Sequence, residues 1–357
     1  MLGTKHKVLR KTCLALALLL MAVSPASFSD GWVAVGESGT ILNSQDGITW
    51  VNVASSPTGE TLRGVAFDGQ GAWVAAGQSG TVIRSDDAQN WSMQDSGISE
   101  PLWGAVYEGG QWIVTGGTGR IITSPDGAAW TSADGLFSFI LYDIAYNGST
   151  LFVIAGDDAS GGSRILTSSD AVAWTQETPD PNNGEGLHGI SYGESQWVAV
   201  GDAGTILTSS DPSSRVWVQQ SSQTNVDLRD IVYNGSGLYV VVGREGTILT
   251  STDGTIWQPQ SSGTSFDLRG VAYDGAVKYI AVGEEGVVLS SADGRNWDVV
   301  YPGESGGPTF RLLYDVASGT LAPGPNTPTA VPVAMWQFYG SLAAAMIALV
   351  FYRLRSK

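Results

Sequence analysis

The sequence predicts an all-β fold, a seven-bladed β-propeller in which a C-terminal strand closes the first blade. Seven similar units each end in a tryptophan, at intervals of 39 to 44 residues. Each unit holds several short apolar runs separated by glycine-containing turns. A period near 40 residues with four short strands per unit is typical of propeller blades. The closing tryptophans are Trp50, Trp91, Trp130, Trp174, Trp217, Trp257 and Trp297.

The unit from Leu228 to Trp257 shows the elements expected of one blade. Asn234-Gly235 and Asp253-Gly254 predict two tight hairpins, because such pairs favour two-residue turns. Residues 243–246 (GREG) turn the chain between the two middle strands. The predicted strands are 228–233, 238–242, 247–251 and a fourth that carries Trp257.

The ends of the repeated region predict how the ring closes. The first unit begins at its second strand, near Trp32, and lacks a first strand. Residues 313–317 (LYDVA) match the first strand at 141–145 (LYDIA) almost residue for residue. We therefore expect the C-terminal strand to complete the N-terminal blade, within a propeller domain of residues 30–319. Closing the ring removes free sheet faces and ends.

Each unit also carries a Ser-x-Asp turn before its tryptophan. Ser and Asp side chains can accept turn N–H groups, and the following glycine supplies a positive φ. We expect a structural role, with the tryptophan packed between blades, rather than seven ligand or metal sites. Copies at 85–88, 169–171 and 210–212 depart from the pattern. The regular copies pair Asp46, Asp126, Asp253 and Asp293 with Trp50, Trp130, Trp257 and Trp297.

These turns resemble the Asp-box of BNR-repeat and sialidase-type propellers, although the glycine here follows the aspartate directly. The combined pattern W-V-A-V-G-x-x-G-T-I-L-x-S-x-D-G-x-x-W is similar to that of the photosystem II stability and assembly factor family. The resemblance covers residues 31 to about 319 and implies the propeller fold. It also implies a basic patch that binds a client protein. Fold alone does not carry function, and no photosynthetic role is predicted.

The N-terminus predicts export. Residues 1–29 resemble a secretory signal peptide, with four basic residues before an apolar run that starts at Cys13. Residues 24–26 (SPA) offer a small-residue cleavage site. Cleavage there would leave a mature chain without cysteine, so disulfides are excluded.

The C-terminus predicts a membrane segment. Residues 320–335 form a Pro/Thr-rich linker, and residues 336–352 contain no charge. As a helix, these 17 residues span about 26 Å, close to the thickness of a bilayer core. The basic residues in 353–357 place the tail in the cytoplasm and the propeller on the periplasmic or outer side of the inner membrane. The tail also resembles PEP-CTERM/exosortase sorting signals, which would process the protein to the cell surface.

The charge pattern argues against two kinds of partner. All 34 acidic residues lie between Asp30 and Asp315, against ten arginines and one lysine, so this region carries a net charge of −23. Such a field argues against nucleic acid and against anionic lipid.

The search for chemistry returns little. His188 is the one histidine after the predicted signal peptide, so neither a zinc site nor a Cys/His pair can form. We predict no catalytic residues, no metal site and no cofactor. Calcium binding is the weaker alternative, through acidic or amide residues at 157–158, 180–183 and 284–285, none with the spacing of a known calcium loop.

Arginines provide the candidate ligand-binding residues. Arg63, Arg229 and Arg269 occupy the same position, second in a first strand, and are expected around the channel mouth. Arg229 and Arg269 fall in neighbouring blades, with Arg63 three blades on; His188 and Arg244 lie beside Arg229. Either these arginines bind an anionic or peptide ligand, or they pair with acidic neighbours, and pairing is favoured. The loop at 175–186 and the insertion at 157–163 belong to the same sector, where we expect the contact surface.

The sequence thus predicts a non-enzymatic exported propeller that binds a protein or peptide at the cell envelope. A sialidase-like or other carbohydrate-active enzyme is the first alternative, although no Tyr/Glu pair is recognisable. A surface or biofilm component released by tail processing is the second.

Overall fold

The structure is a computed structural model that describes residues 29–133, 137–158, 160–177, 185–301 and 311–321. The predicted signal peptide, linker, membrane segment and basic tail lie outside these residues, apart from their boundary positions. Within the described ranges, no helix has the length and apolarity needed to cross a membrane.

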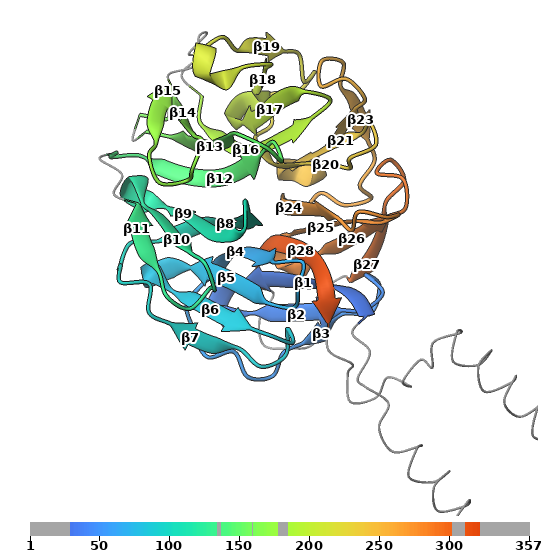
Figure 1. Ribbon diagram of the computed structural model, residues 1–357. Coiled ribbons are helices and arrows are strands. Elements are labelled where there is room, and N and C mark those ends of the chain that lie inside the picture. Colours follow the sequence, from blue (N-terminus) through green and yellow to red (C-terminus); the bar gives the residue numbers. More distant parts are fainter. Residues whose placement is uncertain (1–28, 134–136, 159, 178–184, 302–310, 322–357) are drawn as a thin grey trace, which may run out of the picture. The chain divides into compact units, whose positions relative to one another are not determined.

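Seven four-stranded antiparallel sheets stand around a common axis, which confirms the seven-bladed propeller (Figure 1). We number the blades from the one that contains β1. Blade 1 holds β28 (Leu313–Leu321), β1 (Ser29–Gly36), β2 (Ile41–Ser44) and β3 (Val51–Asn52). Blade 2 holds β4 (Leu62–Phe67), β5 (Trp73–Gly77), β6 (Val82–Ser85) and β7 (Ser92–Gln94). Blade 3 holds β8 (Leu102–Glu108), β9 (Gln111–Gly116), β10 (Ile121–Ser124) and β11 (Thr131–Ala133). Blade 4 holds β12 (Ile140–Tyr146), β13 (Phe152–Asp157), β14 (Ser163–Ser168) and β15 (Thr175–Glu177); blade 5 holds β16 (Leu187–Gly193), β17 (Gln196–Gly201), β18 (Ile206–Ser209) and β19 (Val218–Gln220). Blade 6 holds β20 (Leu228–Tyr233), β21 (Tyr239–Gly243), β22 (Ile248–Ser251) and β23 (Gln258–Gln260); blade 7 holds β24 (Leu268–Tyr273), β25 (Tyr279–Gly283), β26 (Val288–Ser291) and β27 (Asp298–Tyr301).

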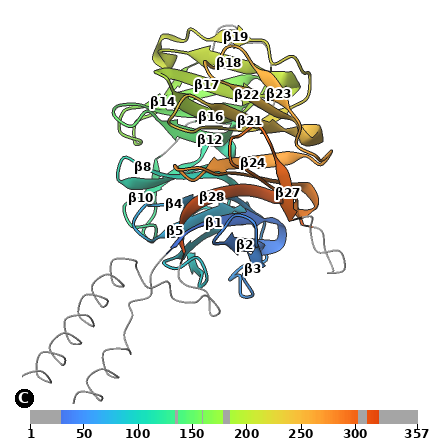
Figure 2. The same ribbon diagram turned by 90° about the vertical axis from the view of Figure 1, so that its right-hand side faces the viewer.

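Strand β28 closes the ring as predicted. It lies beside β1 in blade 1, so the two ends of the propeller are side by side (Figures 1 and 2). The backbone N–H of Glu37 donates to the carbonyl of Leu312 at 3.0 Å, and Leu313 and Val316 are buried. The innermost strands β28, β4, β8, β12, β16, β20 and β24 contact one another in a closed cycle.

A β-bulge interrupts the first strand of each of blades 2 to 7. In β20, Leu228 and Asp230 pair with consecutive residues of β21, so that Arg229 has no partner of its own. The same shift follows the first leucine of β4, β8, β12, β16 and β24. A bulge re-aims the side chain of its extra residue. It therefore presents one side chain per blade at an equivalent place.

The predicted Gly-x-x-Gly turn is a short 3₁₀ segment that brings two backbones into contact. At Gly77, an added Cβ would lie 2.0 Å from the carbonyl oxygen of Thr61, and the next N–H, of Gln78, donates to that oxygen at 2.8 Å. Only glycine fits such an approach. The segments are η1 (Glu37–Gly39), η2 (Gln78–Gly80), η3 (Gly117–Gly119), η4 (Asp202–Gly204), η6 (Arg244–Gly246) and η7 (Glu284–Gly286). Blade 4 has the insertion after Asp157 instead.

The Ser-x-Asp turns have the predicted structural role. The Asp253 Oδ1 atom accepts from the N–H groups of Thr255 and Ile256 at 2.8 and 2.9 Å, and from the Ser251 hydroxyl at 3.0 Å. These donors hold the pKa of Asp253 near 2. Trp257 then packs against Val198 and Val200 of the preceding blade. Two of the irregular copies keep the turn, with Ala88 and Ala171 at positive φ where other copies have glycine.

The predicted two-residue hairpins are wrong. The turn after β20 runs from Asn234 to Leu238, because the Asn234 Oδ1 atom accepts from the N–H groups of Ser236 and Leu238 and draws both into the turn. The turn at Asp253 is also longer, and β23 begins after Trp257 rather than including it. Side-chain acceptors rather than a tight backbone turn close both loops.

Three aspartates join neighbouring blades near the axis. Each lies directly after a bulge position and accepts two N–H groups, one from its own strand and one from the next blade. Asp315 accepts from Val316 and from Val65 of blade 2, both at 2.8 Å. Asp143 and Asp230 join blades 4 to 5 and 6 to 7 in the same way. Glycine at the equivalent position of blades 5 and 7 admits a close approach to the aspartate of the following blade: an added Cβ on Gly189 or Gly270 would lie 2.9 Å from the Cα of Asp230 or Asp315.

We predict that a chain ending after residue 308 loses the stability of the whole propeller, not of blade 1 alone. Removal of β28 exposes the surfaces that Leu313, Val316 and Leu321 bury, at a cost of about 2 kcal/mol or more each. Urea unfolding monitored by tryptophan fluorescence measures the loss. A chain that ends at residue 325 is the control and should unfold like the full-length protein. A normal transition for the shorter chain would contradict the closure argument.

We predict that stability falls between about pH 4 and pH 7. Burial raises the pKa of Asp230 to about 6 and that of Asp315 to about 7, and raises that of Asp143 as well. Because these values lie above the ordinary 3.8, the stabilisation is complete below about pH 4 and disappears as pH rises through 6 to 7. We expect the free energy of unfolding, measured with urea, to decrease by about 1–3 kcal/mol over this pH range. The Asp315→Asn variant should flatten this slope, whereas Asp86→Asn should not; equal slopes would refute the assignment.

Candidate functional site

Six bulge-position side chains and Tyr314, at the equivalent place in β28, form the candidate site, which we call the bulge ring. Each follows the first buried leucine of its innermost strand, so the ring surrounds the axis with one residue per blade. Its members are Tyr314, Arg63, Trp103, Tyr142, His188, Arg229 and Arg269, from blades 1 to 7 in order.

Arg63 lies between two aromatic rings. The Arg63 Cζ atom is 3.9 Å from the ring centroid of Trp103 and 4.6 Å from that of Tyr314. Guanidinium groups stack favourably on aromatic faces, by about 0.5–2 kcal/mol per pair. Among the described residues, no carboxylate pairs with Arg63, and its Nε has no acceptor. The two rings therefore hold the Arg63 guanidinium in place, and no carboxylate of the described residues compensates its positive charge.

Aromatic contacts continue around the ring from Trp103. The Trp103 and Tyr142 rings meet edge to face with centroids 5.0 Å apart, and Tyr142 meets His188 in the same manner at 4.7 Å. The Tyr142 hydroxyl donates to the Asp157 carboxylate at 3.4 Å. Three of the seven ring members thus form a continuous line of aromatic side chains.

A network of ion pairs surrounds the ring arginines of blades 6 and 7. Arg229 Nη2 lies 2.7 Å from Asp227 Oδ2, and Arg269 Nη2 lies 3.4 Å from Asp267 Oδ2. Arg244, on η6, bridges the two carboxylates, at 3.3 Å from Asp227 and 3.1 Å from Asp267. Asp267 also accepts the Glu245 N–H at 3.0 Å. These aspartates thus pair the ring arginines with the adjoining inter-blade turns.

The electrostatics show that the three ring arginines share one region. Burial lowers the pKa of Arg63 and of Arg229, and the like charge of Arg269 lowers both further. Opposing effects act on the carboxylates beside His188. The His188 hydrogen bond lowers the pKa of Asp202, whereas burial raises that of Asp157. The site therefore combines converging cations with partly compensating anions.

The sequence found four of the seven ring members, and the pairing of Arg229, Arg269 and Arg244 with aspartates agrees with the favoured interpretation. Arg63 differs, because aromatic rings surround it instead. Sequence reasoning missed Trp103, Tyr142 and Tyr314, although the signal was present: each follows the same leucine. Asp157 and Gly186, at the edges of the two predicted contact loops, approach each other beside His188. Residues 178–184 lie outside the described residues.

A metal site in the described ranges would require a cluster of ligating side chains. No group of three or more His, Cys, Asp or Glu side chains there could hold a metal ion. Of the residues considered for calcium, Asp158 pairs with Arg164, and 180–183 are not described.

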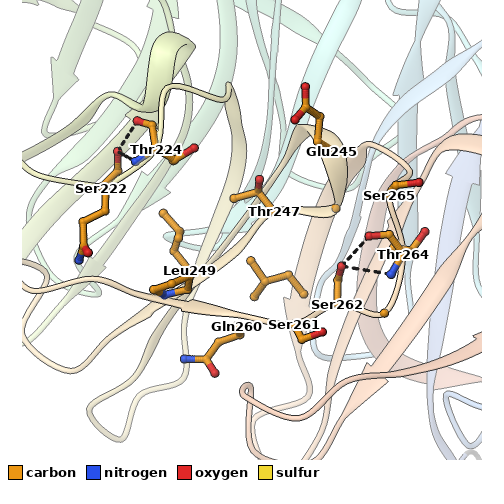
Figure 3. Close-up of a pocket in the computed structure, with 15 residues that line it drawn as sticks. Ser222, Thr224, Glu245, Thr247, Leu249, Gln260, Ser261, Ser262, Thr264 and Ser265 are labelled. Atoms are coloured by element: carbon orange, nitrogen blue, oxygen red, sulfur yellow. Dashed lines mark hydrogen bonds between the residues drawn. The ribbon is translucent and has the colours of Figure 1, made fainter.

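A hollow of about 610 Å³ lies between the loops that enter and leave blade 6 (Figure 3). The Ser222 and Ser262 hydroxyls each donate to the carbonyl of the threonine two residues on, within their own loops. Because these hydroxyls serve the loops, we place the candidate site at the bulge ring.

Comparisons with known proteins agree with the fold. A family model described as the DUF6242 β-propeller domain matches residues 168–309. No curated protein matches the chain. A solved structure of YCF48 bound to D1 peptide is 19% identical, with a TM-score of 0.60 over 75% of this chain and 89% of that one.

Two further solved structures are similar in fold. YCF48 from Cyanidioschyzon merolae is 16% identical, with a TM-score of 0.52 over 67% of this chain and 84% of that one. The WD40 propeller domain of Doa1 is 14% identical, with a TM-score of 0.51 over 73% and 83%. At these identities the likeness shows a shared propeller architecture.

We predict that the Asp267→Ala variant loses about 2–4 kcal/mol of unfolding free energy. It removes a buried carboxylate and leaves Arg244, Arg269 and the Glu245 N–H without that acceptor. The control is Asp86→Ala, because the Asp86 side chain is 73% exposed and pairs with Arg84 at the surface, worth about 0–1 kcal/mol. Urea unfolding measures both, and equal costs would show that the network adds no stability.

Proposed function

We propose that this protein is a non-enzymatic scaffold whose bulge ring binds a carboxylate-bearing peptide segment of a partner protein. The observation that carries the proposal is Arg63: a guanidinium held between two aromatic faces with no carboxylate partner among the described residues. Guanidinium groups recognise carboxylates through paired hydrogen bonds, and aromatic neighbours accept apolar side chains.

The rest of the ring supports this assignment. The Nε atoms of Arg63, Arg229 and Arg269 and the Nε1 atom of Trp103 are buried with no acceptor among the described residues. Three ring arginines, contributed by three blades, favour a ligand rich in oxygen acceptors over a cationic one. Such a ligand meets the uncompensated charge of Arg63 on a propeller that is otherwise strongly acidic.

The similarity to YCF48 bound to D1 peptide supports a peptide as the ligand class. That structure shows that a propeller of similar architecture accommodates a peptide. The identity of a partner here is not carried over from it. We assign the present chain a peptide ligand on the strength of its own ring, with the neighbour as support.

A binding role also accords with the chemistry of the ring. The Tyr142 hydroxyl contacts Asp157. Burial raises the pKa of Tyr142, and the nearby charges of Asp157 and Asp202 raise it further. A tyrosine held in its neutral form is a poor nucleophile. This supports the scaffold proposal over a sialidase-like enzyme.

Export and attachment to the cell envelope complete the proposal. They rest on the predicted signal peptide at residues 1–29 and the uncharged segment at residues 336–352. Intact-mass measurement of membrane-bound and released protein distinguishes a retained C-terminus from a processed one.

We predict that Arg63→Leu weakens peptide binding at least tenfold, since a charge-assisted hydrogen bond is worth about 1.5–3 kcal/mol. The assay is an array of octapeptides with free C-terminal carboxylates and their amidated twins, probed with the full-length chain. The matched control is Arg84→Leu in the same blade, which should bind within about twofold of the unmodified protein. Binding that is indifferent to Arg63, or to the carboxylates of the peptides, would refute the proposed site.

A further inference from the structure

One nitrogen atom in the bulge ring lies between two groups that require opposite roles from it. His188 Nε2 is 2.7 Å from Asp202 Oδ1 and 2.8 Å from Arg229 Nη1. A carboxylate can only accept here, and a guanidinium can only donate. Nε2 cannot donate to Asp202 and accept from Arg229 at the same time, so one of these contacts is unsatisfied.

Of the two contacts, the one with the Asp202 carboxylate is the hydrogen bond that forms. The hydrogen bond from His188 is the leading cause that lowers the pKa of Asp202, so Asp202 is ionised near neutral pH. A bare Nε2 lone pair would then lie 2.7 Å from a charged oxygen without a proton between them. A proton on Nε2 turns that contact into a charge-assisted hydrogen bond.

Arg229 is the group left unsatisfied. With Nε2 protonated, Nη1 of Arg229 faces another donor, and its distance to Asp202 is 3.6 Å. Its Nε has no acceptor among the described residues. Only Nη2 keeps a close carboxylate, Asp227 at 2.7 Å. The Nη1 group of Arg229 therefore has hydrogen-bonding capacity that a ligand carboxylate could use.

We infer that His188 carries its proton on Nε2, and that binding of a carboxylate at Arg229 is coupled to uptake of a second proton at Nδ1. This inference rests on the proposed function. A bound carboxylate offsets the positive charge of Arg229, which otherwise opposes a charged imidazole 2.8 Å away. By linkage, protonation of His188 must strengthen carboxylate binding by the same factor.

The neighbours of His188 define the balance. Tyr142 on β12 meets the imidazole edge to face, and the carboxylate of Asp157, at the end of β13, interacts with it. Asp202 on η4 and Arg229 on β20 contact Nε2. Beyond them, Asp227 pairs with Arg229, and Arg244 on η6 lies near Asp202. Two carboxylates and one arginine are thus the charged groups nearest to the imidazole.

Imidazole ¹⁵N NMR of the full-length chain tests the inference. The sequence holds two histidines, so a His6→Gln variant leaves the His188 signals alone. We expect a protonated Nε2 across pH 5.5–8.5. We also expect the titration midpoint of Nδ1 to rise by about 0.3 in 200 mM sodium acetate relative to sodium chloride, equivalent to about twofold tighter acetate binding by the protonated form.

Matched variants locate the effect. Arg229→Gln should abolish the acetate-dependent shift, whereas Arg84→Gln should preserve it. An unprotonated Nε2 at high pH, or the same midpoint in both salts, would overturn the inference. Failure of the proposed function shows differently, as peptide binding that ignores Arg63, while the protonation state of Nε2 is read without any peptide.

Discussion

The structure depends on the burial of every blade face against a neighbour, because a four-stranded sheet cannot cover its own two faces. The first strands must approach one another closely around the axis to achieve this. At Gly189, for example, an added Cβ would lie 2.9 Å from the Cα of Asp230 in the next blade. Elsewhere an aspartate links the strands directly, as Asp315 does to Val65. The seventh interface forms only when β28 joins β1, so the stability of each blade depends on closure.

The candidate site is a consequence of the same geometry. A bulge in the innermost strand places one side chain per blade at an equivalent position around the axis, and the identity of that residue is free to vary while its location is fixed. The chain uses this freedom unevenly, with aromatic residues in one arc and paired arginines in the other. Arg63 lies within the aromatic arc, between Trp103 from blade 3 and Tyr314 from β28. The closing strand therefore contributes directly to the part of the site that lacks a compensating charge.

The pKa values of aspartates are shifted in opposite directions in different parts of this acidic molecule. In the Ser-x-Asp turns, backbone donors stabilise the ionised form and hold the pKa of Asp293 near 2. Near the axis, burial dominates and raises the pKa of Asp315 to about 7, although it too accepts two N–H groups. Around His188, hydrogen bonding and burial both act, because carboxylates and an arginine lie close to the imidazole. Proton-dependent behaviour therefore concentrates at the centre of the ring, whereas the outer turns keep their charge to low pH.

The sequence by itself determined the number of blades, the closure by residues 313–317 and the structural role of the Ser-x-Asp turns. These follow from a repeated local pattern, and each copy supports the others. It also placed Arg63, Arg229, Arg269 and His188 at one repeat position. Only the tertiary structure decided which of these charges are compensated. Arg229 and Arg269 pair with aspartates two residues earlier in the chain, but Arg63 has threonine at that place and meets Trp103 and Tyr314 instead. The contact between Arg63 and Tyr314 joins residues 314 − 63 = 251 positions apart, and no local pattern encodes it.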